Sequence, residues 1–410
     1  MNVLYLTYDG LTDPLGQSQI ITYLNGLQLQ GHSIHIISFE KHIAFKKYGN
    51  AIQSQLLRTG ITWTPLTYTK NPPVLSTLID LQRLINASEK YIKANSVQLI
   101  HCRSYITSLI GLKLKRKFSI PFLFDMRGLW ADERIDGHIW NLKNPLYKMI
   151  YSFFKKKELA FLKESDAIIS LTHAAKIELE RINAGSTKKT FVIPCCVDTD
   201  LFNTSKINQS DVEKWKVQLS LNDQNKYLVY VGSIGTWYLL KEMLLFFKAL
   251  HKQASEYRFL FITTEDSKMI FNEADRLGIA HQLLLITSSG RSELPALLHL
   301  CHFSIFFIKP AYSKIASSPT KQAELLSMGI PVVCNDGIGD SSIIVERFRS
   351  GIVLKNLTEN DFDTGVNELL NYKSVAVHEM HLHAENEFSL SKGVLLYNQV
   401  YSFIAKGGHS

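Results

Sequence analysis

The sequence predicts an α/β protein built from two doubly wound parallel sheets. Short apolar runs rich in β-branched and aromatic residues alternate with stretches of helical periodicity along the whole chain. This alternation is typical of parallel sheets that helices cover on both faces. The chain has 410 residues, which is more than one hydrophobic core normally serves. We therefore expect two domains of this kind.

Each half of the chain contributes six expected strands. In the first half they cover residues 3–7, 34–38, 99–101, 122–124, 167–171 and 191–193, and in the second half residues 227–231, 258–263, 283–286, 304–307, 332–334 and 352–354. A helix is expected over residues 18–30, and Gly31 should end it. The polar stretch 203–225, with a short helix near 212–219, separates the halves. Ligands of such sheets bind beyond the carboxyl ends of the strands, so the loops that follow strands are the places to search.

Composition describes a globular protein without a membrane-spanning segment. The chain is 46% hydrophobic and 20% charged, which argues against long disorder. No apolar run approaches the roughly 18 residues that a membrane span needs, and the first residues indicate a strand rather than a signal peptide. The five cysteines are irregularly spaced, which fits neither a disulfide framework nor a metal site and favours a reducing cytoplasm.

The net charge of +8 leaves three classes of partner: nucleic acid, an anionic membrane surface and an anionic small substrate. The basic residues are scattered and no zinc-finger or RNA-binding signature accompanies them, which argues against nucleic acid. An aromatic group beside the basic cluster 155–157 suggests a peripheral membrane contact. Its members are Trp140, Tyr147, Tyr151, Phe153 and Phe154. An amphipathic helix packed on the core explains the same residues equally well.

The segment 317–329 has the features of a short helix that begins in a loop. Ser318 is a favourable N-cap residue and Pro319 suits the first helical position, while Gly329 suits the position after the helix. The free N–H groups of a helix N-terminus, with Lys321 beside them, would attract a phosphate group.

Glu324 lies three residues after Lys321 and should share its helix face, where a carboxylate can accept hydrogen bonds from ribose hydroxyls. Ser318, Thr320, Lys321 and Glu324 are therefore candidate ligands of a nucleotide and its diphosphate. The alternative is a well-capped surface helix whose lysine and glutamate are solvated.

Several other loops follow expected strands and carry small or ionisable residues. Small residues at 232–238 permit the backbone to approach a phosphate, although the aromatic pair there could belong to the core. Asp125 and Arg127 form either an ion pair or part of a site. The loop at 9–19 is either an anion site or an ordinary turn. The candidate donor-binding residues of these loops are Gly16, Gln17, Arg103, Ser233, Gly235, Thr236, Trp237 and Arg291. The candidate catalytic residues are Asp125, Arg127 and Lys321.

Residues 378–383 carry three histidines and a glutamate, which suggests a metal site. The histidines of a zinc-binding H-E-x-x-H helix stand four positions apart, whereas His378 and His381 stand three apart. The sequence therefore predicts no metal site here.

Five segments together resemble the retaining GT-B glycosyltransferases of family 4, in particular a branch that makes bacterial cell-surface polysaccharides. They are residues 14–18, 125–133, 194–202, 232–238 and 317–339, and the resemblance covers essentially the whole chain. It implies two Rossmann-like domains that face each other across a cleft. Residues 1–203 would hold the acceptor and residues 204–385 a nucleotide-diphosphate sugar, while residues 386–410 would form a helix that crosses back to the first domain.

The resemblance implies transfer of a sugar of the hexose type with retained anomeric configuration. No metal or cofactor would be bound, and the acceptor would be a saccharide or a polyprenyl-linked saccharide. The protein would be cytoplasmic, with a possible peripheral contact to the inner face of the cell membrane. Two alternatives stay open, namely a nucleotide-sugar epimerase on the same fold and a non-catalytic nucleotide-binding subunit.

Carried over to the first half, the resemblance places Gly16 near the donor phosphates or sugar. It places Asp125 and Arg127 at a strand end that faces the transferring sugar in relatives. Many relatives have a histidine in place of Arg127. Arginine stays protonated, so no general base is assigned at this position.

In the second half, Ser233 stands where many relatives have a phosphate-binding arginine. Tyr238 stands where they have a lysine, so Lys321 would take over that charge. Glu324 matches the ribose-side member of a glutamate pair, whose other position is Ala316 in this chain.

Overall fold

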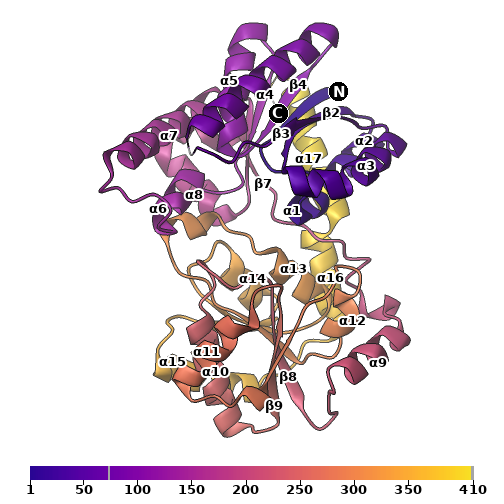
Figure 1. The fold of residues 1–410 in the computed structure, drawn as a ribbon, viewed down its shortest axis with the longest axis vertical. Coiled ribbons are helices and arrows are strands. Elements are labelled where there is room, and N and C mark those ends of the chain that lie inside the picture. The colour runs from indigo at the N-terminus through magenta and orange to yellow at the C-terminus, as the bar shows by residue number, and fades with distance from the viewer. Residues whose placement is uncertain (73, 408–410) are drawn as a thin grey trace. The chain divides into compact units, whose positions relative to one another are not determined.

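The computed structural model describes residues 1–72 and 74–407, which form two compact units (Figure 1). The first unit contains Met1–Cys195 together with the helix that begins at Leu390, and the second contains Cys196–Ser389. Each unit has one parallel sheet with helices packed against it. The predicted fold class, two doubly wound α/β sheets, is thereby confirmed.

The sheet of the first unit has seven strands in the order β3-β2-β1-β4-β5-β6-β7. The strands are β1 Asn2–Thr7, β2 Ser33–Glu40, β3 Thr62–Thr67, β4 Leu99–Arg103, β5 Phe122–Asp125, β6 Ala167–Ser170 and β7 Thr190–Val192. All residues of β4, β5 and β6 are buried, which explains why short continuous apolar runs predict these strands. The chain reverses its direction of travel across the sheet between β1 and β4. Loops diverge at such a point, and ligands of open sheets bind there.

Strand β3 is not predicted by the sequence. Its residues, Thr-Trp-Thr-Pro-Leu-Thr, alternate polar and apolar side chains and include Pro65. The strand lies at an edge of the sheet, where a proline is tolerated because one side of the strand forms no hydrogen bonds with another strand. A short, half-exposed edge strand therefore lacks the apolar run that identifies the central strands.

Nine α-helices of the first unit accompany this sheet within the described residues. They are α1 Pro14–Gly16, α2 Thr22–Leu29, α3 His42–Arg58, α4 Leu75–Ala94, α5 Ser104–Phe118, α6 Trp130–Asp136, α7 Pro145–Glu164, α8 His173–Ile182 and α17 Leu390–Ala405, with the π-helical segment η1 Gln17–Ile21 between α1 and α2. The last helix returns from the far end of the chain to pack on α2. At Gly26 a Cβ atom would lie 2.3 Å from Cγ2 of Val394, so this close packing depends on glycine.

The helix predicted over 18–30 begins earlier, at Pro14, and contains one π-helical turn. Gly16 therefore lies inside the helical run and not in the preceding loop. A Cβ atom at Gly16 would lie 2.1 Å from the carbonyl oxygen of Gly10, so the glycine is required by contact with the chain's own backbone. Gly31 ends the run with φ of 86°, as predicted.

The sheet of the second unit has six strands in the order β10-β9-β8-β11-β12-β13. They are β8 Lys226–Val231, β9 Tyr257–Ile262, β10 Leu284–Thr287, β11 Phe303–Phe306, β12 Val332–Asn335 and β13 Gly351–Leu354, and all six are predicted by the sequence. The α-helices are α9 Gln209–Gln218, α10 Leu240–Gln253, α11 Ser267–Leu277, α12 Leu294–Leu298, α13 Thr320–Ser327, α14 Ser341–Arg347, α15 Glu359–Leu370 and α16 Val377–Phe388. The core between sheet and helices includes the fully buried rings of Phe246, Phe247, Phe259, Phe261 and Phe307.

No helix within the described residues is both long and apolar enough to cross a membrane.

Candidate functional site

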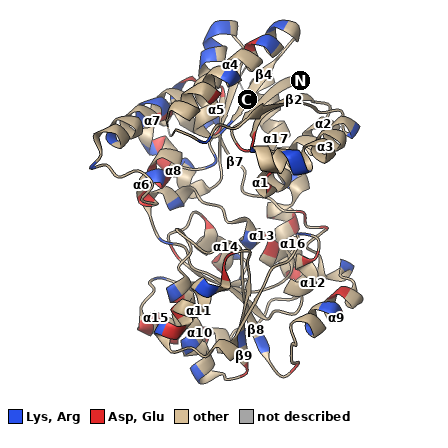
Figure 2. Cartoon of the chain, viewed as in Figure 1, with Lys and Arg blue, Asp and Glu red and all other residues tan. Residues whose placement is uncertain are grey.

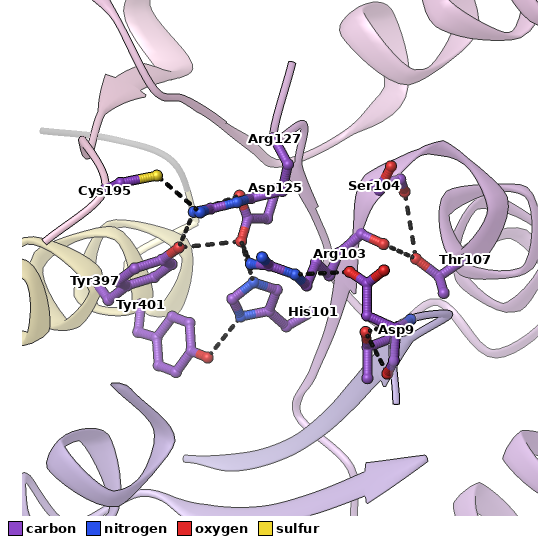
Figure 3. Close-up of polar contacts among 11 residues, drawn as sticks. Asp9, His101, Arg103, Ser104, Thr107, Asp125, Arg127, Cys195, Tyr397 and Tyr401 are labelled. Carbon is purple, nitrogen blue, oxygen red and sulfur yellow. Dashed lines mark hydrogen bonds and ion pairs between the residues drawn. The ribbon is translucent and has the colours of Figure 1, made fainter. Parts of the chain in front are cut away.

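The carboxyl ends of β4 and β5 bring ionisable side chains together in the first unit (Figure 3). Arg103 ends β4 and is the direct register partner of Asp125, which ends β5. His101 lies two residues before Arg103, and Arg127 follows Asp125 in the next turn. The sheet register therefore places these residues at the edge where the sequence predicts them to act.

Asp125 is fully buried and remains ionised. Tyr397 donates a hydrogen bond of 3.0 Å to its Oδ2, and Nε2 of His101 lies 3.4 Å from the same oxygen. Burial alone would raise the pKa of Asp125, but the positive charge of Arg127 and the contact with His101 outweigh burial and hold the pKa below its ordinary value. Among the described residues, no donor lies within hydrogen-bond distance of Oδ1, whose nearest cation is Nη1 of Arg127 at 3.9 Å.

Arg127 adopts a left-handed backbone conformation with φ of 58°. Strained backbone of this kind costs about 1–3 kcal/mol and is concentrated at functional sites. Its Nη1 lies 3.4 Å from Oη of Tyr397, and its Nη2 lies 3.5 Å from Sγ of Cys195. These are long contacts for a guanidinium group, and Asp125 at 3.9 Å supplies its counter-charge. The structure thus supports the interpretation of Asp125 and Arg127 as a charge pair, and their part in a functional site stays a prediction.

His101 is buried and neutral, because burial lowers its pKa below the usual value. Its Nδ1 lies 2.8 Å from Oη of Tyr401, and its Nε2 faces Asp125. The sequence does not identify Tyr397 or Tyr401, which come from α17. The two tyrosines stand four positions apart on one helix face, a pattern that by itself indicates only a packed helix.

Arg103 connects this cluster to the loop after β1. Its Nε donates a hydrogen bond of 3.2 Å to Oδ2 of Asp9, and its Nη1 lies 4.0 Å from Oδ2 of Asp125. Ser104, the next residue, has φ of 68°. A second non-glycine residue in the left-handed region therefore follows a neighbouring strand end.

The loop after β1 is held in shape by a buried carboxylate. Glu40 accepts hydrogen bonds from the backbone N–H groups of Leu11 and Thr12, at 2.8 and 3.1 Å, and from the hydroxyl of Thr12 at 2.6 Å. Gln17, a predicted ligand, instead donates through Nε2 to the carbonyl oxygen of Thr12 at 3.3 Å. These hydrogen bonds within the first unit fix the conformation of the loop.

Lys321 in the second unit is a buried amine on the first turn of α13. Its Nζ lies 4.3 Å from the ring centre of Tyr230 and 3.8 Å from that of Tyr238. No acceptor in the described part of the chain is within hydrogen-bond distance of Nζ. Burial lowers the pKa of Lys321 to about 7, against a smaller opposing effect of the Glu324 charge. The alternative of a solvated lysine is therefore wrong.

The helix around Lys321 differs in one respect from the prediction. Its N-cap residue is Pro319, not Ser318, because Pro319 has ψ of 115° and stays outside the helix. The first helical residue is then Thr320. The C-terminal end follows the prediction, since Gly329 has φ of 67° directly after the helix.

Glu324 and Arg291, two further predicted ligands, contact each other. Nη1 of Arg291 donates to Oε1 of Glu324 at 2.8 Å, and the guanidinium lies 5.2 Å from the ring centre of Phe202. Glu324 is buried, with 6% of its surface exposed, so it is not a solvated surface residue. Glu324 lies on the same short helix as Lys321, one turn further on, and Arg291 reaches it from the segment after β10.

The loop 232–238 after β8 presents small residues to solvent. Ser233, Gly235 and Thr236 are exposed. Trp237 is half-buried beneath the ammonium group of Lys314, whose Nζ lies 3.5 Å from the ring centre. The aromatic pair of this loop, Trp237 and Tyr238, thus contacts two lysines, one each.

Two of the three histidines in 378–383 have structural partners. His381 contacts the carbonyl oxygen of Ser327 at 2.8 Å, and His383 stacks on Phe348. Within the described residues, no group of three or more histidine, cysteine or carboxylate side chains is arranged to hold a metal ion.

Comparisons with known proteins agree with this architecture. Residues 17–201 match the family described as Glycosyltransferase Family 4, and residues 211–383 match the family described as Glycosyl transferases group 1. No curated protein sequence matches the chain.

Three solved structures show the same fold over nearly the full length. A glycosyltransferase from Rickettsia africae is 14% identical with a TM-score of 0.70, covering 99% of this chain and 98% of its own. A sucrose-phosphate synthase from Thermosynechococcus elongatus is 13% identical with a TM-score of 0.72, covering 99% of both chains. The Anabaena protein HepE, solved with UDP and glucose, is 15% identical with a TM-score of 0.67, covering 98% of this chain and 99% of its own.

Two parallel-sheet units of this kind, with polar groups gathered at the carboxyl ends of their strands, have the GT-B fold. With family 4 matched in the first unit and group 1 in the second, the chain belongs to the GT-B glycosyltransferases.

Proposed function

We propose that the protein transfers a sugar of the hexose type from a nucleotide-diphosphate sugar, with retention and without a metal, to a saccharide or polyprenyl-linked saccharide. The product would serve cell-surface polysaccharide synthesis. The observation that carries the proposal is the amine of Lys321, which is buried, lacks a hydrogen-bond acceptor among the described residues, and lies on the first turn of α13. A buried ammonium group is costly unless an anion is bound beside it.

The chemistry requires that negative charge on the leaving diphosphate be stabilised. In the proposed step, the bond between the anomeric carbon and the diphosphate oxygen breaks as the bond to the acceptor oxygen forms. The acceptor's proton passes to an oxygen of the leaving diphosphate. Charged Lys321, together with the N–H groups at the start of α13, would stabilise the growing charge. This role needs no metal ion in addition.

Asp125 and Arg127 are proposed to act on the sugar side of the reaction. Asp125 is ionised, and one of its oxygens has no donor within the described residues. A carboxylate in this state can hold a sugar hydroxyl or stabilise a cation-like anomeric carbon. Arg127 carries a fixed positive charge and would orient an acceptor oxygen, because an arginine does not serve as a general base.

The donor assignment is tested with Lys321→Ala and Glu324→Ala. Donors are first identified by thermal shift against a panel of nucleotide sugars, and turnover is followed as release of nucleoside diphosphate. We expect each variant to lose about 10²-fold or more in kcat/KM, in the range found when one transition-state donor is removed. Lys252→Ala, at an exposed lysine of α10, is the matched control. Unchanged turnover in both site variants would refute the assignment.

We also propose a peripheral contact with an anionic membrane through α7. Three members of the aromatic group predicted from the sequence face inward instead: Trp140 and Phe154 both pack on Trp130, and Tyr151 donates to Asp132. Lys155 is likewise turned inward, where it bridges two carboxylates. These residues fix α7 to the first unit.

A different set of residues faces solvent along this helix and in the turn before it. Its apolar members are Leu142, Leu146, Met149 and Phe153, which are 40%, 45%, 63% and 45% exposed. Exposed lysines flank them at 143, 148, 156 and 163, and Figure 2 shows basic residues along α7. The helix has only two acidic residues, of which Glu158 is buried and Glu164 pairs with Arg116. An apolar stripe with a basic border suits an anionic lipid surface.

The membrane contact is tested by vesicle sedimentation. Wild type should bind vesicles of phosphatidylcholine with phosphatidylglycerol at low salt, and Lys148→Glu with Lys156→Glu should weaken binding by about tenfold or more, since each lysine near such a surface contributes about 1 kcal/mol. The double variant Lys241→Glu with Lys252→Glu, at exposed positions of α10, should bind as wild type does. Equal binding by both double variants would exclude α7 as the contact.

A further inference from the structure

The ammonium group of Lys321 is enclosed by residues from three places in the second unit. Tyr230 belongs to β8, Tyr238 to the loop that follows β8, and Glu324 to α13 itself. The rings of Tyr230 and Tyr238 are nearly perpendicular, at 69°, with centres 5.7 Å apart. Nζ lies against both rings, so the two tyrosines form a seat for one cation.

We propose that Tyr238 is a positioning residue. Its ring and that of Tyr230 hold the Lys321 amine where a diphosphate would bind. Binding of a nucleoside diphosphate then makes this amine take up a proton. The inference rests on the proposed donor site. It explains how the site presents a positive charge, from Lys321, although Tyr238 stands where relatives have a lysine.

Aromatic faces suit this task because they attract a cation without consuming its hydrogen-bond donors. A cation over a ring gains about 0.5–2 kcal/mol. A lysine ammonium group has three N–H donors, and none of them finds an acceptor among the described residues. The amine is therefore held in place while its donors remain for a ligand.

The backbone fixes Tyr238 in its position. Tyr238 forms an antiparallel bridge with Ile308, and its N–H donates to the carbonyl oxygen of Gly235 at 3.1 Å. Its own carbonyl oxygen accepts from the N–H of Leu240 at 3.1 Å. A residue anchored on both sides presents its ring at a defined place, which a mobile loop residue would not do.

Gly232 provides the space that the amine occupies. A Cβ atom at Gly232 would lie 3.0 Å from Nζ of Lys321, and φ of 120° is strained for any other residue. The end of β8 therefore carries a glycine at the point where the lysine reaches the aromatic seat.

In the ligand-free protein near neutral pH, Lys321 is present in both its charged and its neutral form. Burial lowers its pKa to about 7, and Glu324 opposes this only in part, since that carboxylate is bound to Arg291. The rings of Tyr230 and Tyr238 also face the amine, and burial raises the pKa of Tyr230, which therefore stays protonated. A diphosphate placed beside the amine would raise the pKa of Lys321 again, so above neutral pH binding would draw in a proton.

The experiment is isothermal titration of the wild-type protein with UDP, GDP, ADP and dTDP at about pH 8, in two buffers of different ionisation enthalpy. The difference in apparent enthalpy gives the protons taken up. We expect wild type to take up most of one proton with the diphosphate that binds. Lys321→Arg, which is always charged, should bind without proton uptake.

Tyr238→Leu tests the positioning role, and Tyr238→Phe is its conservative counterpart because it keeps the ring. We expect Tyr238→Leu to lose about tenfold in affinity and to change proton uptake, while Tyr238→Phe keeps both. Thermal unfolding of the two variants establishes that both are folded.

The outcomes separate the inference from the function on which it rests. If no nucleoside diphosphate binds wild type, the proposed donor site is wrong and the inference falls with it. If one binds with no proton uptake, or if Tyr238→Leu matches wild type in affinity and uptake, the donor site stands and the inference is overturned.

Discussion

At the residue scale, burial has opposite outcomes for one ionisable group in each unit. Asp125 is surrounded by cations, which hold its pKa below the ordinary value and keep it ionised. Lys321 is surrounded by aromatic rings and has one carboxylate nearby that is already paired, so its pKa is lowered. Within the described residues, Asp125 has partners for its charge except at Oδ1, whereas Nζ of Lys321 has no hydrogen-bond acceptor.

The balance around Asp125 predicts a marked effect of Asp125→Asn. The variant leaves Arg103 and Arg127 buried without their shared counter-charge, which should cost about 3–5 kcal/mol of unfolding free energy. Tyr397→Phe removes one hydrogen bond to the same oxygen and should cost about 1 kcal/mol. Urea unfolding measures both. Equal costs would show that the tyrosine and not the charge organises the cluster.

The same carboxyl group predicts a pH dependence. Because the folded-state pKa of Asp125 lies below its unfolded value, its contribution to stability is complete above the unfolded pKa of about 3.9 and is lost as pH falls through the folded pKa. Below about pH 4 the free energy of unfolding should therefore fall more steeply for wild type than for Asp125→Asn. Parallel curves for the two proteins would contradict this account.

At the element scale, the sequence predicts those helices and strands whose pattern lies within a few neighbouring residues. The buried strands are predictable because both faces are apolar, and Gly31 and Gly329 mark helix ends because only glycine adopts their backbone conformation without cost. Strand β3 is not predictable, since its polar residues carry no apolar run. Tyr397 and Tyr401 are missed for another reason: their partners Asp125 and His101 are 272 and 300 positions away, and no local pattern records such contacts.

The packing of α17 on α2 supplies a prediction for these two elements. Gly26→Ala should destabilise the protein by about 1–3 kcal/mol because the new methyl group overlaps Val394. Val394→Ala in the same chain should recover part of that loss, so the two changes should not be additive. Gly185→Ala is a suitable control, since a Cβ there meets nothing closer than 3.5 Å. Additive losses in the double variant would place the strain elsewhere.

At the scale of the whole molecule, both units gather their unusual groups at the same topological place. In the first unit these groups lie at the carboxyl ends of β4 and β5, and in the second Gly232 and Tyr238 follow β8. The sequence predicts this placement because strand ends can be read from apolar runs. It does not predict which candidates pair with each other, as Arg291 does with Glu324, because those pairs depend on side-chain geometry in the folded unit.

This organisation predicts where a nucleoside diphosphate should protect the backbone. If the donor is held by the second unit, hydrogen exchange should slow at the first turn of α13 and in the loop 232–238 when the diphosphate that binds is added. At a concentration of 100 times Kd the ligand should stabilise the state that binds it by about 2.7 kcal/mol, which sets the size of the protection. Lys321→Ala should remove the protection at both places, because both contact the same amine. Protection that appeared instead at residues 125–133 would assign the diphosphate to the first unit, and would leave the buried amine of Lys321 without a ligand to explain it.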